Sequence, residues 1–132
     1  MDVITSTAAR MMGLPVLAAL TLVTASLPAL ALEGRYQVEG HNPGQAQGYR
    51  GEAVVRHTGE TYSIVWQIGS GRQIGTGLLT GSVLSVVFQS ANGQGAGVAS
   101  FETAGDVITA GRWALIGGQA AGTERWTREA KP

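Results

Sequence analysis

Residue types that commonly carry out chemistry are scarce in this chain. Its 132 residues include no cysteine and two histidines, His41 and His57. A Ser-His-Asp set would need one of these histidines held by a carboxylate beside an activated serine, and no local motif indicates such a set. Without cysteine there is no thiol nucleophile, and no metal-ligand spacing typical of zinc is present. We therefore expect a non-enzymatic protein with no catalytic residues, no metal site and no cofactor.

Two polar positions remain as candidates for a site in the small barrel that the strand pattern predicts. His57 ends a strand on its inward face, where it either lines a ligand mouth or is a half-exposed rim histidine. Glu124 shares a strand face with Trp126, so burial of Trp126 would bury a carboxylate that then needs a partner. We favour a structural end plug over a ligand site, because buried charge pairs are costly and often fix geometry. The candidate partners are three arginines: Arg35, Arg112 and Arg125.

The elements that would position these residues are short alternating strands. In residues 61–68, Tyr62, Ile64, Trp66 and Ile68 fall on one face, which is the period of a half-buried strand. Similar segments separated by glycine-containing turns predict eight strands and no helix. We expect them to form one antiparallel meander barrel of the all-β class. The predicted strands are residues 34–40, 50–57, 61–68, 72–79, 82–89, 96–103, 107–116 and 119–127.

An eight-stranded barrel has an interior that side chains just fill, or that holds one small ligand. Six aromatic residues are expected to point inward and could fill it, with Trp66 deep in the core as a packing residue. Glycines inside the strands would allow the bends that close a small barrel. The six aromatic residues are Tyr36, Tyr62, Trp66, Phe88, Trp113 and Trp126.

Residues 1–31 have the three parts of a secretory signal. Arg10 precedes an apolar run, and Ala29-Leu30-Ala31 is a cleavage site of the Ala-x-Ala type. The remaining residues 32–132 would form a single domain, secreted or periplasmic, that touches a membrane only through the signal before cleavage. Nine basic and nine acidic residues in the whole chain argue against nucleic acid and against a polybasic membrane surface.

Several spaced motifs resemble a group of short exported alphaproteobacterial proteins labelled "fibronectin-binding protein". They are Gly34-x-Tyr36-x-Val38-x-Gly40, Tyr62-x-Ile64-x-Trp66, Gly111-x-Trp113 and Gly122-Thr123-Glu124. The resemblance implies an extracellular or envelope protein as partner. The chain is more loosely similar to calycins, the lipocalin and avidin barrels. That similarity implies a basic residue of the last strand over the first-strand aromatic residue, here Arg125 over Tyr36.

Three functions remain open. The first is an exported module that binds a protein through its loops or outer face, and the second is a barrel that holds a small apolar ligand. The third is an envelope protease inhibitor, disfavoured because only Leu32 and Glu33 precede the first strand. Inward aromatic residues that fill the barrel favour the first, and the volume of the interior separates the first from the second.

Overall fold

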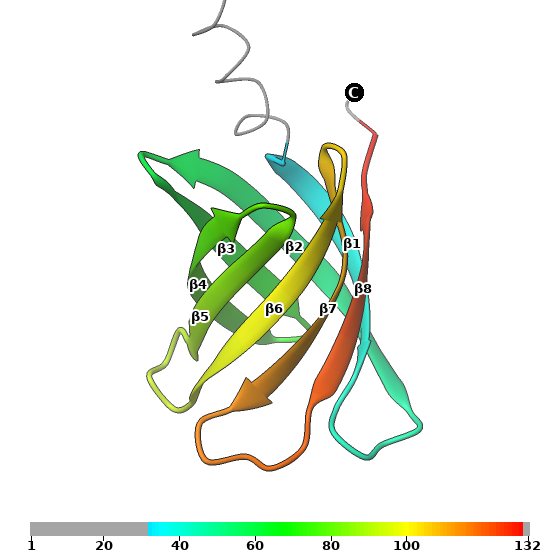
Figure 1. Ribbon diagram of the computed structural model, residues 1–132. Helices are drawn as coiled ribbons and strands as arrows, with labels where there is room; N and C mark the ends of the chain where they lie inside the picture. The colour runs from blue at the N-terminus through cyan, green and yellow to red at the C-terminus, as the bar shows by residue number, and fades with distance from the viewer. Residues whose placement is uncertain (1–31, 131–132) are drawn as a thin grey trace, which may run out of the picture. The chain divides into compact units, whose positions relative to one another are not determined.

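The computed structural model describes residues 32–130 as a closed barrel of eight antiparallel strands joined in chain order (Figure 1). This confirms the predicted all-β meander. Residues 1–31, where the signal is predicted, and residues 131–132 lie outside the described range. Over residues 32–130, no helix has the length and apolar character that crossing a membrane would require. The strands are β1 (Gly34–His41), β2 (Gly48–Thr58), β3 (Thr61–Ile68), β4 (Gly71–Thr80), β5 (Val83–Ser90), β6 (Ala96–Ala104), β7 (Val107–Leu115) and β8 (Gly122–Arg128).

Alternation along each strand decides which side chains enter the barrel. In β3, Tyr62, Ile64 and Trp66 are buried while the residues between them are more exposed, as expected for a pleated strand with one dry face. The ladder between β1 and β8, from Tyr36 opposite Arg128 to His41 opposite Thr123, closes the sheet. Closure removes the free sheet edges that an open sheet of this size would expose.

The last strand begins later than the sequence predicts. Residues 119–121 belong to the β7–β8 loop, and the strand runs from Gly122 to Arg128. The loop turns at Gly117, whose φ is +84°, and Gly122 is the first residue to pair with β7, opposite Trp113. Residues 119–121 pair with neither β7 nor β1, which residue types alone do not reveal.

The two ends of the barrel are built differently. Four hairpins have two-residue loops that begin with a glycine at φ between 60° and 65°, as a type II′ turn requires. Three of them lie at the end that also carries residues 32–33 and 129–130, which we call the terminal end. The opposite end, the loop end, carries the longer connections 42–47, 91–95 and 116–121 (Figure 1).

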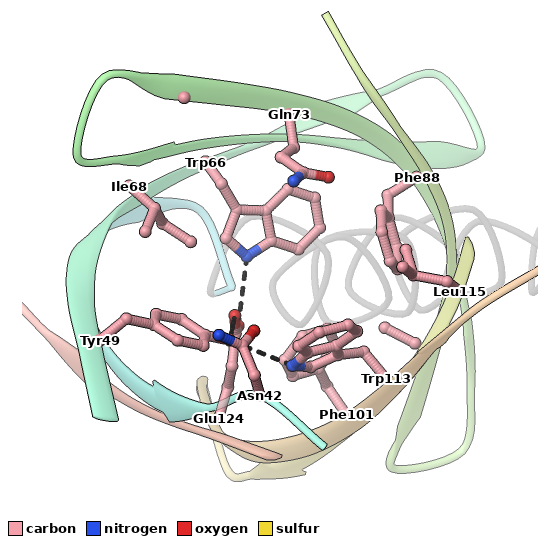
Figure 2. A pocket seen from close by; sticks show the side chains of 12 residues that line it. Asn42, Tyr49, Trp66, Ile68, Gln73, Phe88, Phe101, Trp113, Leu115 and Glu124 are labelled. Carbon is pink, nitrogen blue, oxygen red and sulfur yellow. Dashed lines mark hydrogen bonds between the residues drawn. The ribbon is translucent and has the colours of Figure 1, made fainter. Parts of the chain in front are cut away.

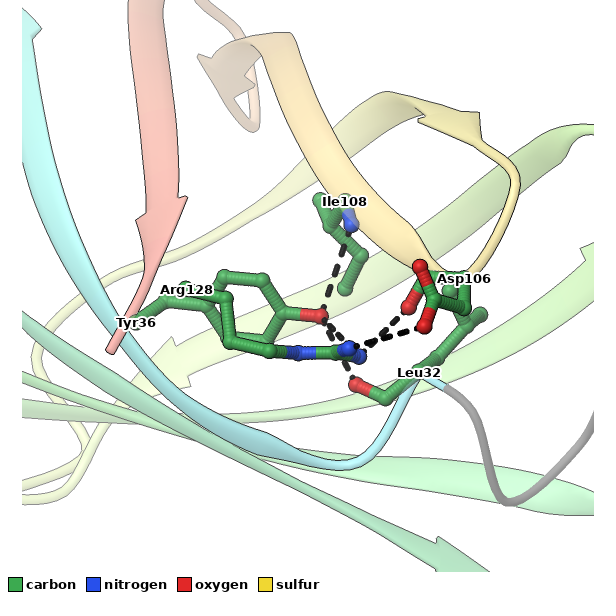
Figure 3. A network of polar contacts seen from close by, with 5 residues as sticks. All are labelled: Leu32, Tyr36, Asp106, Ile108 and Arg128. Carbon is green, nitrogen blue, oxygen red and sulfur yellow. Dashed lines mark hydrogen bonds and ion pairs between the residues drawn. The ribbon is translucent and has the colours of Figure 1, made fainter. Parts of the chain in front are cut away.

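A polar cluster closes the terminal end (Figure 3). The hydroxyl of Tyr36 donates to the carbonyl of Leu32 at 2.9 Å and accepts from the Ile108 N–H at 3.4 Å and from Arg128 Nη2 at 3.1 Å. The Arg128 guanidinium lies 5.4 Å from the centre of the Tyr36 ring and also pairs with Asp106. This cluster joins Leu32 and the end of β8 to the β6–β7 turn.

A bulge in β7 makes that cluster possible. Glu102 pairs with Ala110 but Thr103 pairs with Ile108, so Thr109 is an extra residue. The β7–β8 ladder runs only from Ala110 to Trp113. The backbone N–H of Ile108 is therefore left to the Tyr36 hydroxyl instead of a strand partner.

Glycines inside the strands make room for rings. A methyl group at any of four inward glycines would come closer than 3.0 Å to an aromatic ring on the neighbouring strand. The backbone angles of these four are ordinary, so space rather than flexibility accounts for them. The pairs are Gly40 with Tyr49, Gly97 with Phe88, Gly111 with Phe101, and Gly122 with Trp113.

Candidate functional site

The loop end opens into a cavity of about 360 Å³ inside the barrel (Figure 2). The six aromatic residues that could have filled the interior therefore leave part of it open. Tyr36, Tyr62 and Trp126 pack towards the terminal end or centre, whereas Trp113 is only half-buried and borders the cavity. Apolar lining comes mainly from Trp66, Ile68, Phe88, Phe101, Trp113 and Leu115, and polar lining from Asn42, Tyr49, Gln73 and Glu124.

Trp66 has two roles at once. It is 4% exposed, and its ring centre lies 5.9 Å from that of Phe88 and 6.1 Å from that of Trp126. Its burial agrees with the core position predicted from the alternation of β3. It also forms part of the cavity wall, so one side chain combines core packing with cavity lining.

Glu124 is the centre of a hydrogen-bond network at the cavity wall (Figure 2). Its Oε1 accepts from the indole N–H of Trp126 at 2.8 Å and of Trp66 at 3.2 Å. Its Oε2 accepts from the hydroxyl of Tyr49 at 2.6 Å, which in turn accepts from the indole N–H of Trp113 at 3.0 Å. All three tryptophans of the chain thus contact Glu124 directly or through Tyr49.

Neighbours in the strand ladders explain how the carboxylate fits. Glu124 pairs with Gly40 of β1 on one side and with Gly111 of β7 on the other. Gly40 in turn pairs with Tyr49 of β2, and Gly111 pairs with Phe101 of β6. Two residues without side chains therefore flank the carboxylate, and rings from the next strands extend over the space.

The electrostatics of this site are those of a buried acid. Burial raises the pKa of Glu124 above its usual value, and the hydrogen bonds from Tyr49, Trp126 and Trp66 oppose that rise. Burial, together with the neighbouring Glu124 carboxylate, also raises the pKa of Tyr49. Within residues 32–130 the two ion pairs are Arg35–Glu52 and Arg128–Asp106, and neither involves Glu124. No protein cation therefore balances this carboxylate in the described part of the chain.

The structure places the three residues named from the sequence in different environments. Glu124 is buried, as its shared face with Trp126 predicted, but its partners are a tyrosine and two tryptophans instead of an arginine. Arg125 is exposed and borders a second hollow, which Glu39, Arg50 and Glu124 also line. The expected packing of Arg125 over Tyr36 is also wrong.

Arg128, three residues further along β8, covers the Tyr36 ring instead. The two arginines differ because residues 125 and 128 fall on opposite faces of the strand, and the end of β8 lets Arg128 turn back over the barrel end. His57 is half-buried at the terminal end, away from the cavity. Its ring lies 5.1 Å from that of Tyr62, and its backbone N–H donates to Glu33 at 2.6 Å.

Tyr49 and Gln73 were not identified from the sequence. The sequence predicts that the second strand begins at Arg50, one residue after Tyr49, whereas β2 begins at Gly48. Strand parity was the available signal, because Tyr49 has the same parity as the inward Ala53 and Val55. For Gln73, opposite Trp66 in the β3–β4 ladder, the same parity argument applies.

Two further observations bear on the site. Among residues 32–130, no group of three or more histidine, cysteine, aspartate or glutamate side chains is placed to hold a metal ion. No protein-family model matches the sequence, and a search of curated proteins found no match.

Proposed function

We propose that this is an exported, non-enzymatic binding protein whose barrel takes up a small, mainly apolar molecule through the loop end. The observation that supports this is the cavity of about 360 Å³ walled by Trp66, Phe88, Phe101 and Trp113. Small-molecule sites are typically concave, mostly apolar, and provided with a few polar groups that fix orientation. Glu124 and Tyr49 supply such polar groups on one wall.

The cavity sets the size of the ligand. A water molecule occupies roughly 30 Å³ of liquid, so the space corresponds to about a dozen waters. A single aromatic ring with a short chain matches that volume. The terminal end is closed by the Tyr36 and Arg128 cluster, so such a ligand enters and leaves between the three longer loops.

The test uses 4-phenylbutan-1-ol, an uncharged probe of that size. Because the three tryptophans lie in or beside the cavity wall, binding should change the intrinsic fluorescence, and isothermal titration calorimetry gives the affinity and stoichiometry. Ala99 borders the cavity, so Ala99→Leu should weaken binding by partly filling it. Val98→Leu, at the adjacent outward position, is the matched control.

The outcomes are distinct. Saturable one-to-one binding that Ala99→Leu weakens and Val98→Leu leaves unchanged supports the proposal. Absence of binding for probes of this size, or equal effects of the two variants, contradicts it.

A second candidate function, binding of a protein such as fibronectin, is supported by an apolar outer surface. Leu78, Val87 and Val98 are 56%, 63% and 56% exposed on β4, β5 and β6. Val87 pairs with Val98, and Leu78 lies two residues from Thr76, the β4 partner of Val87, so the three are neighbours. Contiguous exposed apolar side chains of this kind often mark protein contacts.

Surface-immobilised fibronectin tests this candidate. Val87→Glu should abolish binding if this outer surface makes the contact, and Thr127→Glu, at an exposed position of β8, should not. Equal binding by the two variants would contradict a contact through this surface.

A further inference from the structure

We propose that the ligand of the barrel is an organic cation whose ammonium group binds at the Glu124 carboxylate, among the aromatic rings that line the cavity. This inference rests on the proposed small-molecule function and specifies the chemical class of the ligand. Four features of the site support it.

The first feature is a carboxylate without a counter-ion. Glu124 is 8% exposed, and neither of the two ion pairs formed within residues 32–130 reaches it. Its neighbour Arg125 is exposed, on the alternate face of β8. A buried charge is costly unless it is paired, so a cation supplied by the ligand would stabilise this carboxylate.

The second feature is the direction of the hydrogen bonds. An indole N–H can only donate, so Trp66 and Trp126 both present protons to Oε1. The hydroxyl of Tyr49 accepts from Trp113 and gives its proton to Oε2. The network therefore stabilises the acceptor form of Glu124, which is the ionised one.

The third feature is unused acceptor capacity at the cavity wall. An ionised carboxylate offers about four acceptor positions, two on each oxygen. Oε1 receives two donors and Oε2 receives one, which leaves one position on Oε2. Glu124 borders the cavity, so a ligand N–H can reach that position.

The fourth feature is the arrangement of the rings. Trp66 meets Phe88 at an interplanar angle of 60°, and Phe88 meets Trp113 at 81°. Rings at these angles enclose the space from several sides instead of stacking on one another. Aromatic faces attract cations, and tryptophan does so most strongly. The same walls that bury an apolar chain therefore also favour a positive head group.

The experiment compares three probes of one shape and different charge: 4-phenylbutylamine, 4-phenylbutan-1-ol and 4-phenylbutyrate. Calorimetry on the wild-type protein should show the amine binding at least about tenfold more tightly than the alcohol. That factor is the size expected for a charge-assisted hydrogen bond that replaces a neutral one. The anion should bind more weakly than the alcohol, because its negative charge would be repelled by the Glu124 carboxylate.

Failure of this inference differs from failure of the proposed function. If amine and alcohol bind equally, or the alcohol binds better, the cation inference is overturned and the small-molecule function stands. If none of the three probes binds, both are overturned.

Glu124→Gln tests the role of the charge at nearly constant shape. It should reduce the preference for amine over alcohol to less than about twofold, because the remaining hydrogen bond is between neutral groups. Glu52→Gln, which removes an exposed carboxylate outside the cavity, is the control and should keep the preference. A Glu124→Gln protein that folds, as judged by circular dichroism, and retains the full preference would refute the proposal.

A wild-type measurement decides the question even if Glu124→Gln fails to fold. The group hydrogen-bonded to Glu124 that also titrates is Tyr49 of β2, and the pKa of its hydroxyl is raised. Inside the barrel, the residues that face Glu124 from β1, β3, β6 and β7 do not titrate: Gly40, Trp66, Phe101, and Gly111 with Trp113. The ionisable side chains that border the second hollow with Glu124 lie at the outward positions of their strands: Glu39, His41, Arg50 and Arg125. Amine affinity should therefore fall as the pH is lowered from about 8 to about 4, when Glu124 gains a proton.

Alcohol affinity should stay constant over the same range. A constant amine affinity would overturn the proposal, because it would place the ammonium group away from the carboxylate.

Discussion

Replacement of Gly122 by alanine tests whether the inward glycines exist to make room for the cavity rings. A methyl group at Gly122 would lie within 3.0 Å of three atoms of the Trp113 indole, and these are the three nearest atoms. The ring is held by Phe88, at 6.4 Å between ring centres, and by its N–H bond to Tyr49. The added methyl group must therefore displace the indole or the strand that carries it.

The size of the effect follows from these contacts. Overpacking of a well-filled site typically costs about 1–3 kcal/mol, and loss of the hydrogen bond to Tyr49 adds about 1 kcal/mol. We expect Gly122→Ala to lower the free energy of unfolding by about 2–4 kcal/mol in urea melts. Gly71→Ala is the control, because its nearest neighbour would be at 3.4 Å. It should change the free energy of unfolding by no more than about 1 kcal/mol. The change should be stabilising, because alanine lowers the conformational entropy of the unfolded chain.

A double-mutant cycle isolates the cause. In a Trp113→Ala background the ring is gone, so Gly122→Ala should cost less than about 1 kcal/mol, and the coupling energy should be about 2 kcal/mol. An unchanged cost in that background would refute the argument that Gly122 is needed for the ring. It would point instead to a requirement of the backbone.

Three further predictions concern the terminal end, the buried acid and the signal. Arg128→Gln should destabilise the protein by about 1–3 kcal/mol, because it removes contacts with Tyr36 and Asp106. Arg35→Gln, at an exposed ion pair, should cost less than about 1 kcal/mol. Equal costs of the two variants in urea melts would contradict a stabilising role of the polar cluster at the terminal end. Because burial raises the folded-state pKa of Glu124 above 4.5, its contribution to stability is fully present below that pH and is lost as the pH rises through the folded value. The free energy of unfolding of the wild type, relative to that of Glu124→Gln, should therefore decrease as the pH rises. A relative stability that does not change with pH, or that increases, would show that the carboxyl is not buried as described. Mass spectrometry of the exported protein should give an N-terminus at Leu32, whereas uncleaved protein in the inner membrane would contradict a signal peptide.

The fold could be predicted from the sequence because it depends on local patterns. Alternation in residues such as Tyr62, Ile64 and Trp66 identifies both the strand and its inward face. The glycine that begins each two-residue turn marks where one strand ends and the next begins. Short, regular strands with two-residue turns leave an antiparallel meander as the simplest arrangement. The start of β8 was less predictable, because residues 119–121 pair with neither neighbouring strand and only the closed sheet shows this.

The site depended on contacts between residues far apart in the chain. Parity alone placed Glu124 inside, but its partners Tyr49 and Trp66 lie 75 and 58 residues away, and only the closed sheet brings them to it. From the sequence, an arginine was the expected partner of Glu124, because a buried carboxylate commonly forms an ion pair. In the structure, Arg125 points outward by the same parity that turns Glu124 inward.

Whether the interior was filled or hollow was also decided by the tertiary structure. The number and type of inward residues do not fix the volume, because the outcome depends on where each ring lies along the barrel axis. Tyr36 and Trp126 pack against each other at 5.2 Å between ring centres, and Tyr36 belongs to the cluster that closes the terminal end. Trp66 and Trp113 lie nearer the loop end, separated by the cavity they line. The sequence by itself therefore determined a barrel with an aromatic interior, and the strand register decided that this interior encloses a space with one buried acid at its wall.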